Sequence, residues 1–291
     1  MTTLLQNLPL SSLPTEEDLP DTDDQPVDNE LQLLVPFLLQ SILLLAWADR
    51  QDWFMGVNIG LYHTVGKPAI GPDALLSLGA ERVRENSKLR LSYVVWQEGV
   101  MPQWVLEVVS QKPGGEYERN RDRQANQGKL FKYAQMGIKY YTIYNPNYWK
   151  RDKHDPFEVY YLVNGVYVRQ PGNPVWMPEI GLGIGKGQGT HKGYTQEWLY
   201  WYDKQGNQYP APANVIQQQQ ERVRQEQERV RQEQQLRQQA ERERDQERQQ
   251  KEQEQKRAEQ AETRLEQLAQ RLRTLNPEQL RVLGFDPDEV S

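Results

Sequence analysis

The sequence predicts an α+β fold followed by a long charged helix, and three observations support this class. Short segments with the apolar or alternating character of β-strands lie between residues 56 and 170, separated by Gly and Pro. One segment with helical spacing, 118–137, interrupts these strands. From residue 214 to residue 276 the chain contains neither Gly nor Pro and is rich in Gln, Glu and Arg, which favours a continuous helix.

Composition changes along the chain predict four parts. Residues 1–30 carry eight acids and no base, so we expect a disordered acidic arm. Residues 31–213 are expected to form the α+β domain, which lies within the usual size range of a single domain. Residues 214–275 are expected to form a charged helical or coiled-coil arm, and residues 276–291 a short helical tail.

The first apolar run of the domain, 31–48, is predicted to be a buried helix. It approaches the length of a membrane span, but Gln32, Pro36 and Gln40 interrupt it and no basic flank precedes it. The N-terminus also lacks the basic start and apolar region of a signal peptide. We therefore expect a soluble, cytoplasmic protein without membrane contact.

The remaining elements of the domain follow from local patterns. An Asn-Gly pair at 164–165, between two alternating segments, predicts a β-hairpin over 157–170. The helix over 118–137 presents an apolar side and ends at Gly137. The other expected strands are 56–64, 74–79, 91–96, 104–109 and 140–146.

The charged arm carries a heptad register whose two seam positions are both apolar only over 258–275. Upstream, the same positions hold Glu and Arg or Lys at a spacing of four, which favours pairs within one helix. A spacer with a short self-association seam is the simpler interpretation, and a specific partner-binding helix is the alternative. The seam predicts a weak parallel homodimer.

A carboxylate inside an apolar strand is the main candidate for chemistry. Glu107 lies within WVLEVVS, 104–110, where an uncompensated charge would cost several kcal/mol, about the cost of an unpaired buried ion. Asp73, before the strand 74–79, and Lys129, on the next helix, could converge with it. Two carboxylates could bind Mg²⁺ or Mn²⁺, and the lysine could position or deprotonate a water. The alternative is a structural Glu107–Lys129 pair without metal, with Asp73 capping a turn.

Composition limits the other possibilities. The chain has no Cys, which excludes disulfides and thiolate-bound zinc, and its three His show no ligand spacing. The net charge of -6 arises mainly from the acidic residues 1–30, and the rest of the chain is close to balanced, so a large basic face is absent. This argues against a protein built mainly to hold nucleic acid. The stretch 112–153 nevertheless has ten Lys or Arg against four acids. A rim that contacts DNA phosphates, or a merely solvated face, is therefore expected at Arg119, Arg121, Arg123, Lys150, Arg151 and Lys153.

Four segments in the same order and spacing resemble the Uma-type restriction-endonuclease-like family of the PD-(D/E)XK nuclease superfamily, which is common in cyanobacteria. They are GPDALLSLG (71–79), LSYVVWQEGVMPQWVLEVVS (91–110), KLFKYAQMGIKYYTIYNP (129–146) and PEIGLGIGKGQG (178–189). The resemblance covers roughly residues 31–210. It implies a restriction-endonuclease-like core, in which helices flank a mixed sheet, and Mg²⁺-dependent phosphodiester cleavage.

Carried over residue by residue, the resemblance implies a site. Asp73 matches the acid of the PD element and Glu107 the acid of (D/E)XK, with the Val108 carbonyl as a further metal ligand. Val109 stands where the motif has lysine, and the family's K-x-x-x-Y pattern on the following helix fits Lys129 and Tyr133, with Lys132 as the substitute. The chain departs from the family at SQKPGGEY, in place of Ser-Pro-Ser-Thr, at QANQGK, which lacks the usual acid before the lysine, and at Asn145, in place of Asp.

Two functions from different classes follow. The first is a metal-dependent DNA endonuclease in which Asp73 and Glu107 bind Mg²⁺ and Lys129 positions the attacking water. The alternative is a non-catalytic nuclease-fold module that binds nucleic acid or acts as a scaffold, assembled through its coiled coil.

Overall fold

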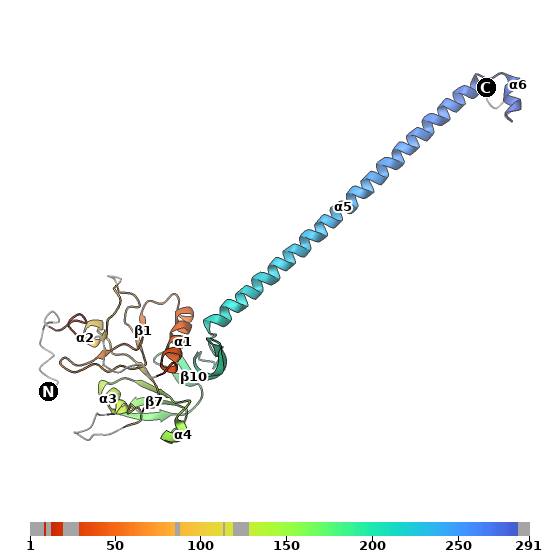
Figure 1. Cartoon of the computed structure of the whole chain (residues 1–291). Helices are drawn as coiled ribbons and strands as arrows, with labels where there is room; N and C mark the ends of the chain where they lie inside the picture. The colour runs from red at the N-terminus through yellow and green to blue at the C-terminus, as the bar shows by residue number, and fades with distance from the viewer. Residues whose placement is uncertain are drawn as a thin grey trace. The chain divides into compact units, whose positions relative to one another are not determined.

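The computed structural model describes residues 9, 13–19, 29–84, 88–112, 114–118 and 128–284. Contacts divide the chain into two units, residues 1–217 and 218–291, which are considered separately below. The first unit is a mixed α+β domain (Figure 1), and a long helix follows it in the chain, so the predicted fold class is confirmed.

A six-stranded mixed sheet forms the centre of the domain, in the order β1-β3-β5-β6-β7-β8. β5 and β6 are parallel, and every other neighbouring pair is antiparallel. Because β5 and β6 run in the same direction, the loops that follow them leave the sheet at the same edge. The strands are β1 (Trp53–Val57), β3 (Ala74–Leu78), β5 (Trp104–Val108), β6 (Tyr140–Tyr144), β7 (Phe157–Val163) and β8 (Val166–Gln170).

One face of the sheet packs on α1 (Leu31–Ala46) and on a second, three-stranded sheet. The indole of Trp201 in this sheet donates a hydrogen bond to the Leu39 carbonyl of α1, at 3.0 Å. The apolar run is therefore a core helix, as expected, and no helix in the described ranges is long and apolar enough to cross a membrane. The second sheet has the order β11-β10-β9 and comprises β9 (Val175–Met177), β10 (Leu182–His191) and β11 (Tyr194–Tyr202).

The opposite face packs on α3 (Lys129–Met136), with Leu130 and Tyr133 buried against Val105 and Val109 of the sheet. Strand residues alternate between the two cores, as the period of two predicts. The helix ends at Gly137, which adopts a left-handed conformation with φ of 80°. The predicted helix began at residue 118, but residues 119–127 lie outside the described part of the chain.

Three local predictions have different outcomes. The hairpin is confirmed, with left-handed φ values at Asn164 and Gly165 in its turn. The strand expected over 56–64 is divided into β1 and β2 (Leu61–Tyr62), because Asn58 adopts a left-handed conformation, φ 47°, that no strand accommodates. The strand expected over 91–96 is only β4 (Tyr93–Val94), which continues directly into α2 (Val95–Glu98).

Part of the range predicted to be an acidic arm has a described conformation. The Glu16 side chain is buried and forms an ion pair with Arg84. The indole of Trp96 donates to the Pro14 carbonyl at 2.9 Å. Of residues 1–30, only 9, 13–19, 29 and 30 are described. The predicted disorder of the other residues in this range concerns a part of the chain that the structure does not describe.

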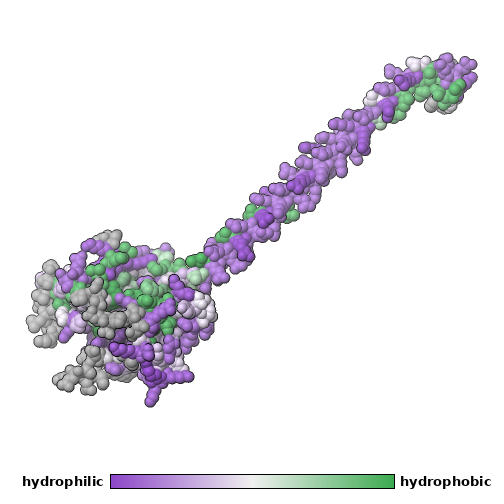
Figure 2. All heavy atoms as spheres, viewed as in Figure 1, coloured by the Kyte–Doolittle hydropathy of each residue, from purple (hydrophilic) through white to green (hydrophobic). Residues whose placement is uncertain are grey.

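The charged arm is a single helix, α5 (Pro212–Arg273), and none of its residues is buried. The expected intrahelical pairs are present, with Glu233–Arg237 at 2.7 Å and Glu247–Lys251 at 2.8 Å. Hydrophilic side chains cover most of its surface (Figure 2). The helical tail is α6 (Pro277–Val282), which begins at Asn276 with a reciprocal capping box.

Candidate active site

Glu107 lies on a central strand of the sheet, on the face that packs against α3. Its side chain is buried, and Val105 and Val109 flank it on the same face. β3 pairs with β5 so that Ala74 is opposite Leu106, and continuing this antiparallel register by one residue places Asp73 opposite Glu107. Directly opposed residues of an antiparallel pair point to the same face, so the two carboxylates are neighbours.

Two side chains from α3 donate hydrogen bonds to the Glu107 carboxylate. The Lys129 Nζ atom lies 2.7 Å from Oε2, and the Tyr133 hydroxyl donates to Oε1 at 2.5 Å. Lys129 is the first residue of α3 and Tyr133 lies one turn later on the same side of the helix. The cation and the hydroxyl donor explain how an acid is accommodated inside an apolar strand.

The Asp73 carboxylate is hydrogen-bonded to Val108, the residue that follows Glu107. Its Oδ2 atom accepts a hydrogen bond from the Val108 backbone N–H at 2.6 Å, and the side chain is 7 % exposed. The Val108 carbonyl, a candidate metal ligand, accepts a hydrogen bond from Gln32 Nε2 of α1 at 3.1 Å. The fold thus brings Asp73, Glu107, Val108 and Lys129 together.

The pKa values of these groups reflect burial and mutual charge. Burial, and then the negative charge of Glu107, raise the pKa of Asp73 well above its usual value. Burial also raises the pKa of Glu107, and Lys129 and Tyr133 only partly oppose this effect. Burial alone would lower the pKa of Lys129, but the attraction of Glu107 outweighs it and the pKa is raised. Lys129 is therefore a stable cation beside two crowded acids.

A third acid, Glu116, was not anticipated. It is buried, and its carboxylate accepts from the Gly114 backbone N–H at 3.0 and 3.1 Å. Its negative charge contributes to the raised pKa values of Asp73, Glu107 and Lys129. The backbone N–H of Lys129 also donates to the Gly115 carbonyl at 2.9 Å, which holds this loop at the start of α3.

The position of Glu116 explains why the sequence pattern hid it. Glu118 and Gly128 are in contact although nine residues separate them, and a Cβ atom on Gly128 would overlap the Glu118 backbone. If residues 119–127 are left out of the count, Glu116 stands four positions before Lys129. QANQGK, directly before the lysine, carries no acid, and the acid whose charge acts on Lys129 comes from GGEY instead. An allowance for an insertion in the pattern would have found it.

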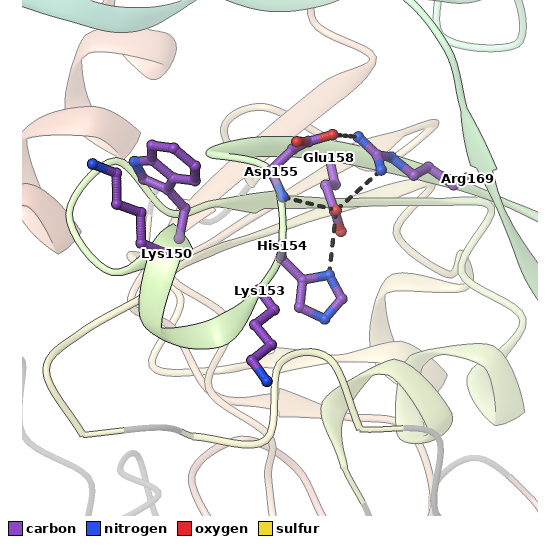
Figure 3. A pocket seen from close by; sticks show the side chains of 7 residues that line it. Lys150, Lys153, His154, Asp155, Glu158 and Arg169 are labelled. Carbon is purple, nitrogen blue, oxygen red and sulfur yellow. Dashed lines mark hydrogen bonds and ion pairs between the residues drawn. The ribbon is translucent and has the colours of Figure 1, made fainter.

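The other predicted basic residues divide into four groups. Lys132 forms no ion pair with any described residue, so Lys129 and not Lys132 reaches the acids. Arg119, Arg121 and Arg123 lie outside the described residues. Arg151 pairs with Asp152 at 2.6 Å. Lys150 and Lys153 line a cavity of about 410 Å³ together with Trp149, His154, Asp155, Glu158 and Arg169 (Figure 3), which includes neither Asp73 nor Glu107.

The donor set at Asp73 and Glu107 suits a hard divalent ion. Two carboxylates and one backbone carbonyl are oxygen ligands, which Mg²⁺ and Mn²⁺ prefer. Within the described ranges no three His, Cys, Asp or Glu side chains are grouped closely enough to hold a metal. The protein would therefore supply two carboxylates, and water and substrate oxygens would complete the coordination, as is usual for Mg²⁺.

Comparison with known proteins defines the class. The family model Uma2, described as "Putative restriction endonuclease", matches residues 25–187. The chain belongs to this Uma2 family. A solved structure from Anabaena variabilis, described as a "putative nuclease belonging to DUF820", is similar over 57% of this chain and 90% of its own, with 12% identity and a TM-score of 0.37. No curated protein matches the chain.

Proposed function

We propose that this protein is a divalent-metal-dependent endonuclease that hydrolyses phosphodiester bonds in DNA. Asp73, Glu107 and the Val108 carbonyl would hold Mg²⁺ or Mn²⁺, and Lys129 would position the attacking water. The observation that carries this proposal is the 2.7 Å contact between Lys129 and Glu107, beside Asp73, in a chain of the Uma2 family.

The chemistry of each residue follows from its surroundings. A bound divalent ion supplies positive charge and Lewis acidity at a phosphate oxygen. Asp73 and Glu107 repel each other, which favours binding of a cation between them. The raised pKa of Lys129 keeps the amine protonated at neutral pH, so it acts as a hydrogen-bond donor to water or phosphate and not as a base. Tyr133 holds the second Glu107 oxygen in place.

A non-catalytic nuclease-fold module is the second candidate, and one observation favours it. Both Glu107 oxygens and the Val108 carbonyl already have partners within the protein, namely Lys129, Tyr133 and Gln32. In this interpretation the buried pair stabilises the core, and the protein binds nucleic acid or acts as a scaffold. DNA is the proposed partner in the first case, and self-association through residues 258–275 stays a prediction in both.

One cleavage assay distinguishes the nuclease from the non-catalytic module. Supercoiled plasmid, linear duplex and single-stranded DNA are incubated with the protein in Mn²⁺ or Mg²⁺, beside Asp73→Asn. The nuclease proposal expects metal-dependent cleavage of at least one substrate by wild type, and loss of about 100-fold or more in the variant, as for removal of a main electrostatic group. Wild-type protein that cleaves none of the three, or a variant that cleaves equally well, would favour the non-catalytic module.

A further inference from the structure

The segment that follows β6 combines aromatic and basic side chains on its surface. In α4 (Trp149–Asp152), Trp149 is 37% exposed, and the Lys150 ammonium lies 5.2 Å from the centroid of its ring. Lys153, directly after α4, is exposed as well. Neither lysine forms an ion pair with any residue in the described ranges, so both ammonium groups are available to an external anion.

The other charges around this cavity are paired with one another (Figure 3). Arg169 forms ion pairs with Asp155 and, at 3.3 Å, with Glu158. His154 Nδ1 lies 3.3 Å from the same Glu158 carboxylate. Lys150 and Lys153 are therefore the basic groups at the cavity that form no ion pair with any residue that the structure describes.

The segment is held in a fixed conformation. Asn145, which is fully buried, donates to Asp152 at 2.9 Å and accepts from the Tyr148 backbone N–H at 2.9 Å. Arg151 donates to the Ser110 carbonyl, at 3.4 Å, in the loop after β5. Lys153 adopts a left-handed conformation, φ 57°, where Gly would cost less. A rigid segment loses little conformational entropy when it binds a ligand.

This segment and the acidic site lie at the same edge of the sheet. The loops after β5 and β6 leave from adjacent parallel strands. Tyr117, next to Glu116, stacks on the His154 ring with centroids 3.7 Å apart, and its hydroxyl accepts from Asn145 at 3.2 Å. A nucleic-acid strand held at the cavity would therefore lie close to the proposed metal ligands.

We propose that Trp149, Lys150 and Lys153 bind an unpaired segment of nucleic acid, an inference that rests on the proposed nuclease function. The Trp149 ring stacks on an exposed base, and the two ammonium groups contact the flanking phosphates. Stacking requires a base whose face is free, which a continuous duplex does not offer, whereas any unpaired base does. Lysine contacts with phosphate give affinity without sequence preference.

Binding is measured without cleavage, by fluorescence anisotropy in EDTA and in Ca²⁺, with a labelled single-stranded oligonucleotide and with the same oligonucleotide annealed to its complement as a blunt-ended duplex. The variants are Trp149→Ala and the double variant K150A/K153A. The matched controls are Tyr194→Ala, another exposed aromatic residue, and K67A/K204A, two exposed lysines elsewhere in the domain. Circular dichroism establishes that each variant is folded.

The two kinds of contact give different signatures. K150A/K153A should reduce the slope of log affinity against log salt by about 1.4 for single strands, because each phosphate contact contributes about 0.7. Trp149→Ala should weaken single-strand binding by about 5- to 150-fold, the range that the loss of one base–aromatic stacking contact gives, and should leave the slope unchanged. Its effect on the duplex should be much smaller, and both controls should bind as wild type does.

Several results would overturn the proposal. The first is that the wild-type protein does not bind the oligonucleotide, and the second is that both variants bind it with wild-type affinity. The third is that Trp149→Ala loses as much affinity for the duplex as for the single strand. Displacement of the oligonucleotide by inorganic phosphate at equal concentration would indicate a free-phosphate site and would also overturn it. Trp149-dependent binding by a wild-type protein that cleaves nothing would reject the nuclease function and leave this binding site standing.

Discussion

The ammonium of Lys129, at the start of α3, lies 2.7 Å from the carboxylate of Glu107, the last residue but one of β5. The cation beside this acid therefore comes from a helix and not from the strand itself. Val109, two residues after Glu107, is buried in the same core cluster as Leu130 and Tyr133. Replacement of Lys129 shows what the contact contributes.

Lys129→Met should destabilise the domain by about 2–4 kcal/mol, because it leaves the buried Glu107 carboxylate without its cation. Without the lysine the pKa of Glu107 rises further, so the loss should be smaller at pH 5 than at pH 8. Urea unfolding at pH 5 and at pH 8 measures this loss of stability. Lys132→Met, which removes a lysine of the same helix that forms no ion pair with any described residue, should change stability by less than about 0.5 kcal/mol. An equal effect of the two variants would contradict the prediction.

Asp73→Asn should make the metal-free protein more stable at neutral pH, by about 1 kcal/mol. The pKa of Asp73 is raised in the folded state, so its favourable contribution is present below the unfolded pKa, about 3.9, and is lost as the pH rises through the folded pKa. Asn can still accept from the Val108 N–H. The gain should therefore grow from pH 4 to pH 7 in thermal melts recorded with EDTA, and a gain independent of pH would contradict this account.

Mn²⁺ should bind wild type in calorimetry, and Asp73→Asn and Glu107→Gln should each weaken binding about 10-fold or more. Binding must displace the proton that the raised pKa of Asp73 retains, so the affinity should increase with pH and protons should be released. Glu197→Gln, which removes a half-exposed carboxylate of β11, is the control. If both site variants bind as wild type does, the ligand assignment is wrong.

Self-association should depend on the end of α5. Leu265 and Leu268 are 67% and 53% exposed, so this part of the apolar seam is exposed in the single chain. The seam is only about two and a half heptads long, which predicts a weak dimer. L265K/L272K should shift the full-length protein towards monomer in sedimentation with no change in the melting of the domain. Leu236→Lys, an exposed leucine outside the seam, should leave the distribution unchanged, and a dimer that survives L265K/L272K would place the interface elsewhere.

The sequence was most informative where neighbouring residues decide the structure. The Asn164-Gly165 turn, the Gly137 cap and the burial of α1 follow from local patterns. The approach of Lys129 to Glu107 was an expectation from order along the chain, and the packing of α3 on β5 realises it. Glu116 was missed because its place depends on the contact between Glu118 and Gly128, which no local pattern indicates.

The lengths of short strands were also harder to predict. Asn58 ends β1 by adopting a left-handed conformation that its apolar neighbours do not reveal. The same limit applies to the cavity beside α4. Arg169 of β8 pairs there with Glu158 of β7, and Lys150 and Lys153 are the cations without an ion pair to any residue in the described ranges.

The initial rate of Mn²⁺-dependent plasmid nicking tests the central claim most directly, compared among wild type, Glu107→Gln, Lys129→Met and Lys132→Met. We expect nicking by wild type and by Lys132→Met, and a loss of about 100-fold or more in Glu107→Gln and in Lys129→Met. Circular dichroism at the assay temperature must show that each variant is folded. Nicking at the wild-type rate by folded Glu107→Gln or Lys129→Met would contradict the account.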